Sequence, residues 1–200
     1  MKKLSKYAWW ISRIFEPPMV AGITIVLAMY WGWINNLPWR FFLALGFFDI
    51  FLPFVYFLVS LAKRKVSNWE WSVRQERLPI YVFTALCHFL GILAASWFGK
   101  LEIMRLLISL YVLFLVFLTI ITRYKISTHT GVLSSLIFIL VVFFGPWFWL
   151  GYLLVALVGW SRVSLKTHQV SEVFWGAVLP PMVLSLAFRF WGQPVFCGSC

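Results

Sequence analysis

The chain has 200 residues and a formal net charge of +11, yet only 12% of its residues are charged and 62% are hydrophobic. A soluble globular domain has about 25% charged residues. It cannot bury this much apolar surface, which here includes 13 Trp and 21 Phe side chains. The composition therefore excludes a soluble domain and predicts an integral membrane protein. The basic excess is then explained by its placement on loops, and we expect no nucleic-acid partner.

The first element in chain order is a predicted interfacial helix in residues 1–18. The stretch "LSKYAWWISRIF" has apolar residues at helical spacing, with Lys6 and Arg13 between them. This pattern is typical of a helix that lies in the plane of the membrane surface. We expect this helix to end at Glu16-Pro17-Pro18, because proline breaks the helical hydrogen-bond ladder.

Seven apolar segments of about bilayer-spanning length follow this helix. Lipid offers no partner for unpaired backbone groups, so each segment must be helical. The predicted fold is an all-α polytopic transmembrane helix bundle of about six to seven spans, forming a single integral membrane domain over residues 1–200. The segments are 19–34, 41–62, 79–98, 103–122, 130–145, 147–160 and 172–190.

Span parity predicts the orientation of the chain. Thirteen of the seventeen Lys and Arg residues fall on the side of the N-terminus and of the loops after spans two, four and six. The positive-inside tendency places this side in the cytoplasm, and we expect a multi-pass protein of the plasma membrane. The residues are Lys2, Lys3, Lys6, Arg13, Lys63, Arg64, Lys65, Arg74, Arg77, Arg123, Lys125, Arg162 and Lys166.

Two polar residues lie well inside apolar segments. Asp49 falls in the second span and His88 in the third. A charged side chain in the bilayer interior costs about 2.5–3.5 kcal/mol on insertion scales, so each residue needs a partner or a function. Because the two spans are neighbours in sequence, we expect Asp49 and His88 to pair in a structural role.

Three polar stretches lie at loop–span junctions that parity assigns to one membrane face. They are "WSVRQERLPIY" (71–81), "RYKISTHTG" (123–131) and "SRVSLKTHQVSEV" (161–173). If the bundle brings them together, they form one pocket with several cations, two imidazoles and one carboxylate. Arginine binds phosphate oxygens bidentately, and lysine adds a point charge. One imidazole can attack phosphorus while the other protonates the leaving oxygen, and a carboxylate on the far ring nitrogen orients the nucleophile.

The three stretches resemble the three signature motifs of the type 2 phosphatidic acid phosphatase superfamily, in its membrane lipid phosphatase branch. The third family motif, S-R-x5-H-x3-D, is matched by Ser161-Arg162, His168 and, with glutamate in the last place, Glu172. The second, P-S-G-H, is matched by Ser127 and His129 in "ISTH". The first, K-x6-R-P, is the weakest: Glu70 stands in the lysine place, and Leu78 separates Arg77 from Pro79.

The resemblance covers residues 71–190, and it implies a metal-independent phosphatase that works through a phosphohistidine and needs no cofactor. It implies that His168 is the nucleophile, Glu172 its orienting carboxylate and His129 the general acid. It implies phosphate binding by Arg162, Arg77 and Ser127. We add Arg74, one helical turn from Arg77, and Lys125, which is close to His129 in sequence.

The implied substrate is an amphiphile with its phosphate at headgroup depth, such as a lipid or polyprenyl phosphate or diphosphate. Three alternatives to a phosphatase are open at this point. A lipid phosphotransferase can use the same pocket, and a non-catalytic lipid-binding protein can carry the same charges. A transporter or channel is disfavoured because only Asp49 and His88 qualify as intramembrane polar residues that line a path, and because the spans lack the paired Gly/Pro breaks of transporters.

Overall fold

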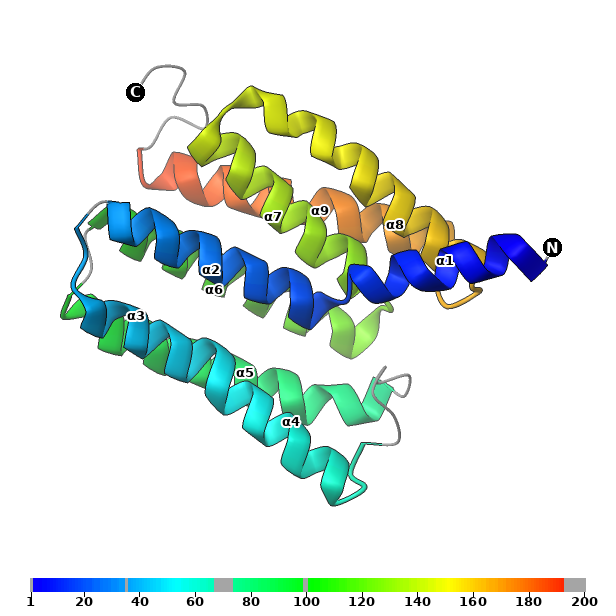
Figure 1. Ribbon diagram of the computed structural model, residues 1–200, viewed down its shortest axis with the longest axis horizontal. Coiled ribbons are helices and arrows are strands. Elements are labelled where there is room, and N and C mark those ends of the chain that lie inside the picture. The colour runs from blue at the N-terminus through cyan, green and yellow to red at the C-terminus, as the bar shows by residue number, and fades with distance from the viewer. Residues whose placement is uncertain (1, 35, 67–73, 99–100, 193–200) are drawn as a thin grey trace. The chain divides into compact units, whose positions relative to one another are not determined.

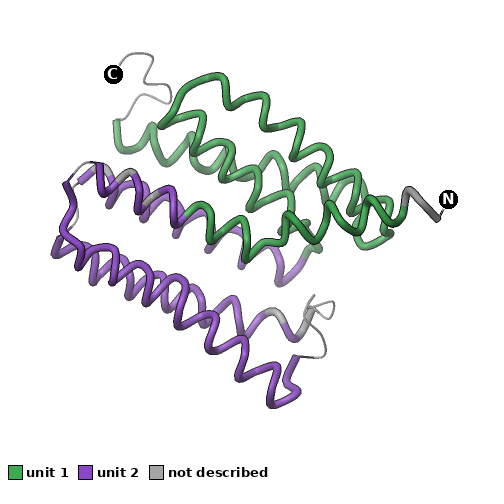
Figure 2. Tube along the Cα trace, viewed as in Figure 1, with its two compact units in different colours: residues 1–24, 124–200 green, residues 25–123 purple. Residues whose placement is uncertain are grey.

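The computed structural model describes residues 2–34, 36–66, 74–98 and 101–192, and every regular element within these ranges is a helix (Figure 1). The predicted all-α class is thereby confirmed. The chain divides into two compact units, residues 1–24 with 124–200 and residues 25–123 (Figure 2).

Five helical stretches are long and apolar enough to cross a membrane, which agrees with a membrane protein. Each of the seven predicted spans overlaps a helix. The fifth, helix α7 (Thr128–Phe144), has 17 residues, and the sixth is divided between the 3₁₀ turn η2 (Pro146–Gly151) and helix α8 (Tyr152–Ser164). The number of seven spans and the cytoplasmic orientation stay predictions. The five stretches are Ser5–Ile34, Trp39–Ala62, Leu78–Ser96, Ile103–Arg123 and Val170–Phe190.

The first helix ends at Glu16-Pro17-Pro18, as the sequence predicts. Helix α1 (Lys2–Ile14) stops just before Glu16, and helix α2 (Pro17–Ile34) begins at the first proline. Helix α7 ends at Gly145, whose φ of +114° lies in a region that other residues rarely adopt. The interfacial location of α1 stays a prediction, since the structure describes a helix that packs on α8.

The unit that contains residues 124–200 is built around the packing of α7 on helix α9 (Val170–Phe190), with α8 against both (Figure 1). Hydroxyl groups of α7 join it to backbone carbonyls of α9. The Oγ1 of Thr130 donates to the Val173 carbonyl at 3.3 Å, and the Oγ of Ser134 donates to the Ala177 carbonyl at 2.6 Å. Such bonds suit helices in an apolar medium, where an unsatisfied hydroxyl is costly.

Gly176 allows the close approach of α7 and α9. A Cβ at this position would lie 2.3 Å from the Thr130 Oγ1 and 2.6 Å from the Ser127 carbonyl oxygen. Both distances are below van der Waals contact, and the second involves backbone, which cannot rotate away. A small residue at the contact is the usual device for close helix packing in membranes.

The other unit contains the remainder of α2, one helical stretch that runs from Trp39 to Ala62, and two long helices, α5 (Arg74–Ser96) and α6 (Leu101–Arg123). The Trp39–Ala62 stretch consists of α3 (Trp39–Leu45), the π-helical turn η1 (Gly46–Phe51) and α4 (Leu52–Ala62). Asp49 lies within the π turn.

The predicted pair of Asp49 and His88 is confirmed. The Nδ1 of His88 contacts the Asp49 Oδ1, and its Nε2 lies 3.3 Å from the Leu107 carbonyl oxygen. One imidazole therefore links η1, α5 and α6. Gly91, one turn after His88, leaves room for the carboxylate, because a Cβ there would lie 3.2 Å from the Asp49 Oδ2.

We predict that His88→Leu lowers the free energy of unfolding by about 3 kcal/mol. The substitution leaves the Asp49 carboxylate among apolar helices without its hydrogen-bond partner. Thermal denaturation of the purified protein in detergent measures the effect. The double variant Asp49→Leu/His88→Leu removes both polar groups and is expected to recover most of the lost stability. A double variant that is less stable than His88→Leu alone would contradict a purely structural pair.

Candidate active site

The turn after α8 holds His168 beside Arg162. Lys166 has a φ of +55°, the Thr167 N–H donates to the Arg162 carbonyl at 3.1 Å, and the Lys166 N–H donates to the Val163 carbonyl at 2.9 Å. These are the two bonds of a Schellman motif, which closes the carboxyl end of a helix. The His168 N–H also points to the Arg162 carbonyl, at 3.3 Å. The five-residue interval between Arg162 and His168 is thus the length of one helix-capping turn.

Glu172 caps α9 and orients His168 with the same oxygen. Its Oε2 accepts from the Gln169 N–H at 3.2 Å, which is half of a capping box, and lies 2.7 Å from the His168 Nδ1. Both His168 and Glu172 are buried. A glutamate at this helical position is the usual partner in a capping box. The glutamate side chain is longer than that of the aspartate in the family motif, and it reaches the imidazole while the Gln169 N–H holds its carboxylate.

Lys125 lies at the edge of this pair. Its Nζ donates to the Thr167 carbonyl at 2.6 Å and is 3.9 Å from the Glu172 Oε2. About half of the Lys125 side chain is exposed. The ammonium group therefore contacts the turn that carries His168 and the carboxylate that orients it, while remaining accessible to a ligand.

Ser127 and His129 begin α7 next to Glu172. The Ser127 N–H donates to the Glu172 carbonyl at 3.1 Å, and its buried hydroxyl accepts from the Thr130 N–H as the N-cap of the helix. His129 is the second residue of α7 and is half-buried. The roles of Ser127 as a phosphate ligand and His129 as a general acid stay predictions.

Arg162 ends α8 with its guanidinium directed to α1. Its Nη1 donates to the Oγ of Ser12 at 2.6 Å. Sequence patterns contained no signal for this contact, since the two residues are far apart and belong to no common motif. Thr167 and Gln169 were also absent from the predicted site, although "HQVSE" contains the Gln-x-x-Glu spacing of a capping box.

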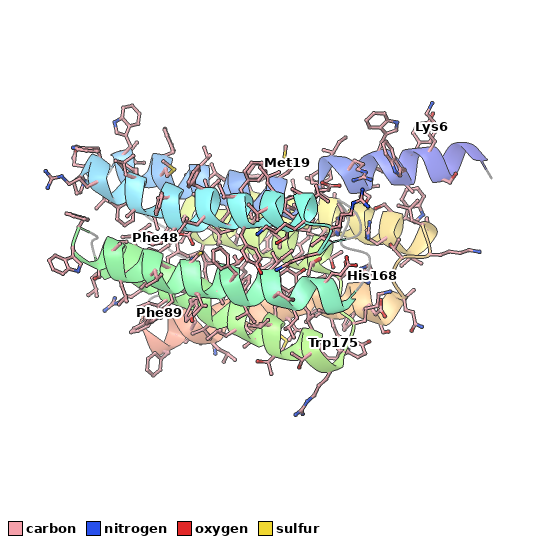
Figure 3. All side chains as sticks on the ribbon, turned by 90° about the horizontal axis from the view of Figure 1, so that it is seen from below. Lys6, Met19, Phe48, Phe89, His168 and Trp175 are labelled. Carbon is pink, nitrogen blue, oxygen red and sulfur yellow. The ribbon has the colours of Figure 1, made fainter. Side chains whose placement is uncertain are left out.

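Arg74 and Arg77 belong to the first turn of α5, in the unit of residues 25–123. Their side chains lie outside the described residues, and their assignment as phosphate ligands stays a prediction. The structure thus brings together five of the predicted site residues within one unit: Arg162, Lys125, Ser127, His168 and Glu172. His129 lies in the first turn of α7, directly after the N-cap Ser127 and Thr128. Figure 3 labels His168, which is buried, and Lys6, which is exposed on α1.

The pKa of His168 is lowered to about 4, mainly by burial. The positive charges of Arg162 and Lys125 also lower this pKa, and the contact with Glu172 raises it. The imidazole is therefore neutral at neutral pH. Its Nδ1 faces a carboxylate, which accepts a hydrogen bond, so the proton is assigned to Nδ1 and the lone pair to Nε2. A neutral imidazole with a fixed tautomer, beside two cations, has the properties of a nucleophile toward an anionic ester.

Comparison of the chain with protein-family models, with curated proteins and with solved structures gives no match. The resemblance to the phosphatase superfamily stays a prediction from the three motifs.

We predict that His168 makes the folded state less stable as the pH falls. Its folded pKa lies below the ordinary value near 6.5, so the unfolded chain binds the proton first. The free energy of unfolding contributed by this group is therefore lost as the pH falls from about 6.5 to about 4. Melting temperatures of the wild type and of His168→Asn over this range measure the difference. Parallel curves for the two proteins would contradict the lowered pKa.

We predict that Gly176→Ala destabilises the protein by about 1–3 kcal/mol, because the added Cβ overlaps the start of α7. Gly22→Ala is the matched control, since a Cβ at Gly22 in α2 has no neighbour within 4 Å. The melting temperature in detergent is expected to fall for the first variant and to be unchanged or higher for the second. An equal response of both variants would contradict the close contact.

Proposed function

We propose that the protein is a membrane phosphatase that hydrolyses a lipid or polyprenyl phosphate monoester or diphosphate through a phosphohistidine at His168. The observation that carries the proposal is the contact of 2.7 Å between the His168 Nδ1 and the Glu172 Oε2, in a neutral imidazole flanked by Arg162 and Lys125. A buried histidine–carboxylate pair beside cations favours nucleophilic attack on phosphorus over a structural role alone.

In the first step the Nε2 lone pair of His168 attacks phosphorus, and the bond from phosphorus to the ester oxygen breaks. The leaving oxygen takes a proton from His129, which acts as the general acid. The ring of His168 becomes positively charged in the phosphohistidine, and Glu172 stabilises that charge through Nδ1. Arg162 and Lys125 supply positive charge to the non-bridging oxygens in the transition state.

In the second step water attacks the phosphorus of the phosphohistidine, and His129 accepts a proton from this water. The bond from phosphorus to nitrogen breaks, inorganic phosphate leaves, and His168 returns to the neutral form. Both histidines are then back in the protonation states in which they began the cycle. The reaction uses the charges of arginine and lysine for electrostatic stabilisation.

The site lies at the ends of its helices, which supports an amphiphilic substrate. Lys125 precedes α7, Arg162 is in the last turn of α8, and His168 precedes α9, whose residues form a candidate span. Helix ends of membrane spans lie at headgroup depth. A substrate with its phosphate at this depth can keep its acyl or prenyl chains in the lipid.

We predict that purified protein releases inorganic phosphate from lipid phosphates in the presence of EDTA, and that His168→Ala reduces the rate by roughly a thousandfold or more. Arg189→Ala, which removes an exposed cation at the other end of α9, is the matched control and is expected to retain activity. Transfer of phosphate to an added alcohol, with little release to water, would indicate a phosphotransferase. If neither reaction occurs with any of the lipid or polyprenyl phosphates tested, the enzymatic proposal is overturned in favour of a lipid-binding protein.

We predict that the loss caused by His129→Ala depends on the leaving group. A general acid contributes about 10²–10⁴-fold when the leaving alcohol is a weak acid. It contributes much less for p-nitrophenyl phosphate, whose leaving group departs as a stable anion. His168→Ala is expected to abolish turnover of both substrates. A His129→Ala variant that loses the same factor on an alkyl and an aryl phosphate would contradict the role of His129.

A further inference from the structure

Helix α1 packs along α8 and buries two small side chains, Ala8 and Ser12. Ala8 and Ser12 are one helical turn apart, and both are buried, whereas Tyr7, Trp10 and Ile14 on the same helix are more than half exposed. The two small residues allow the backbone of α1 to approach the last turns of α8. This approach brings a hydroxyl group within reach of the arginine that ends α8.

The Oγ of Ser12 accepts a hydrogen bond of 2.6 Å from the Nη1 of Arg162. Ser12 is only 6% exposed, so water has little access to compete for this bond. A charge-assisted bond in such a place is stronger than one between neutral groups.

The backbone and the side chain of Arg162 are thus held from two directions. The carbonyl of Arg162 accepts from the Thr167 and His168 N–H groups, and from the Thr167 Oγ1 at 2.9 Å. The guanidinium is held by Ser12 from α1. An arginine side chain has several rotatable bonds, and fixing its distal end reduces the freedom that is lost when an anion binds.

We propose that Ser12 is a positioning residue of the phosphate site: through its hydrogen bond it orients the Arg162 guanidinium for binding the substrate phosphate beside His168. The proposal rests on the proposed phosphatase function. It makes α1 a part of the active site, although α1 carries none of the three motifs. Loss of the Ser12 hydroxyl weakens phosphate binding in the ground state and the transition state alike, because the arginine remains present but is no longer oriented.

The test uses full-length Ser12→Ala, with Ser12→Thr as the variant that keeps the hydroxyl and Ser164→Ala as a control in α8. We expect Ser12→Ala to raise both KM and the inhibition constant for inorganic phosphate by about three- to tenfold, with kcat little changed, as for the loss of one hydrogen bond used in binding. Ser12→Thr is expected to retain most of the affinity. Melting temperatures show whether each variant is folded.

A double-variant cycle separates positioning from a general effect on α1. In an Arg162→Ala background, Ser12→Ala is expected to have no further effect on the phosphate inhibition constant, because the group it orients is gone. An equal loss in both backgrounds, or an unchanged inhibition constant for Ser12→Ala, would overturn the role of Ser12. If the wild type releases no phosphate from any substrate, the proposed function fails and this inference fails with it. If the wild type is active and Ser12→Ala matches it, the inference alone fails.

Discussion

The hydrogen bond from the Ser127 N–H to the Glu172 carbonyl joins the first turns of α7 and α9, and the candidate site depends on that junction. It is possible because Gly176 leaves no side chain between the two helices. Once the two helix starts are adjacent, Lys125 comes within 3.9 Å of the Glu172 carboxylate. The packing of small residues at the contact of two helices therefore brings these two opposite charges together.

Helix capping and catalytic geometry use the same atoms at this site. The Glu172 Oε2 satisfies the Gln169 N–H and also contacts the His168 ring, and the Arg162 carbonyl closes α8 while it holds the backbone of His168. Groups that must be satisfied at helix ends are fixed in position by that requirement. A nucleophile anchored to two helix ends needs little further organisation before it meets an anion.

Two acidic residues outside the candidate site each contact one basic partner. Asp49 and His88 satisfy one another inside the unit of residues 25–123, and Arg13 pairs with Glu16 between α1 and α2. In contrast, His168 is surrounded by more positive than negative charge, since Arg162 and Lys125 outnumber Glu172. A local excess of positive charge beside a neutral imidazole suits an anionic ligand, and it distinguishes this cluster from the balanced pair in the other unit.

Hydropathy and short-range spacing determined the class of this protein from its sequence alone. Apolar runs predicted the helices, and Glu16-Pro17-Pro18 predicted the end of the first, because both depend on local backbone geometry. The third motif pointed to the contact of His168 with Glu172, which are four residues apart on the chain. The tertiary structure decided the rest. That α1 lies on α8 and Ser12 reaches Arg162, and that Gly176 meets Thr130, depends on which helix faces are complementary in shape. Helical periodicity shows which residues share a face, but it does not specify the partner of that face.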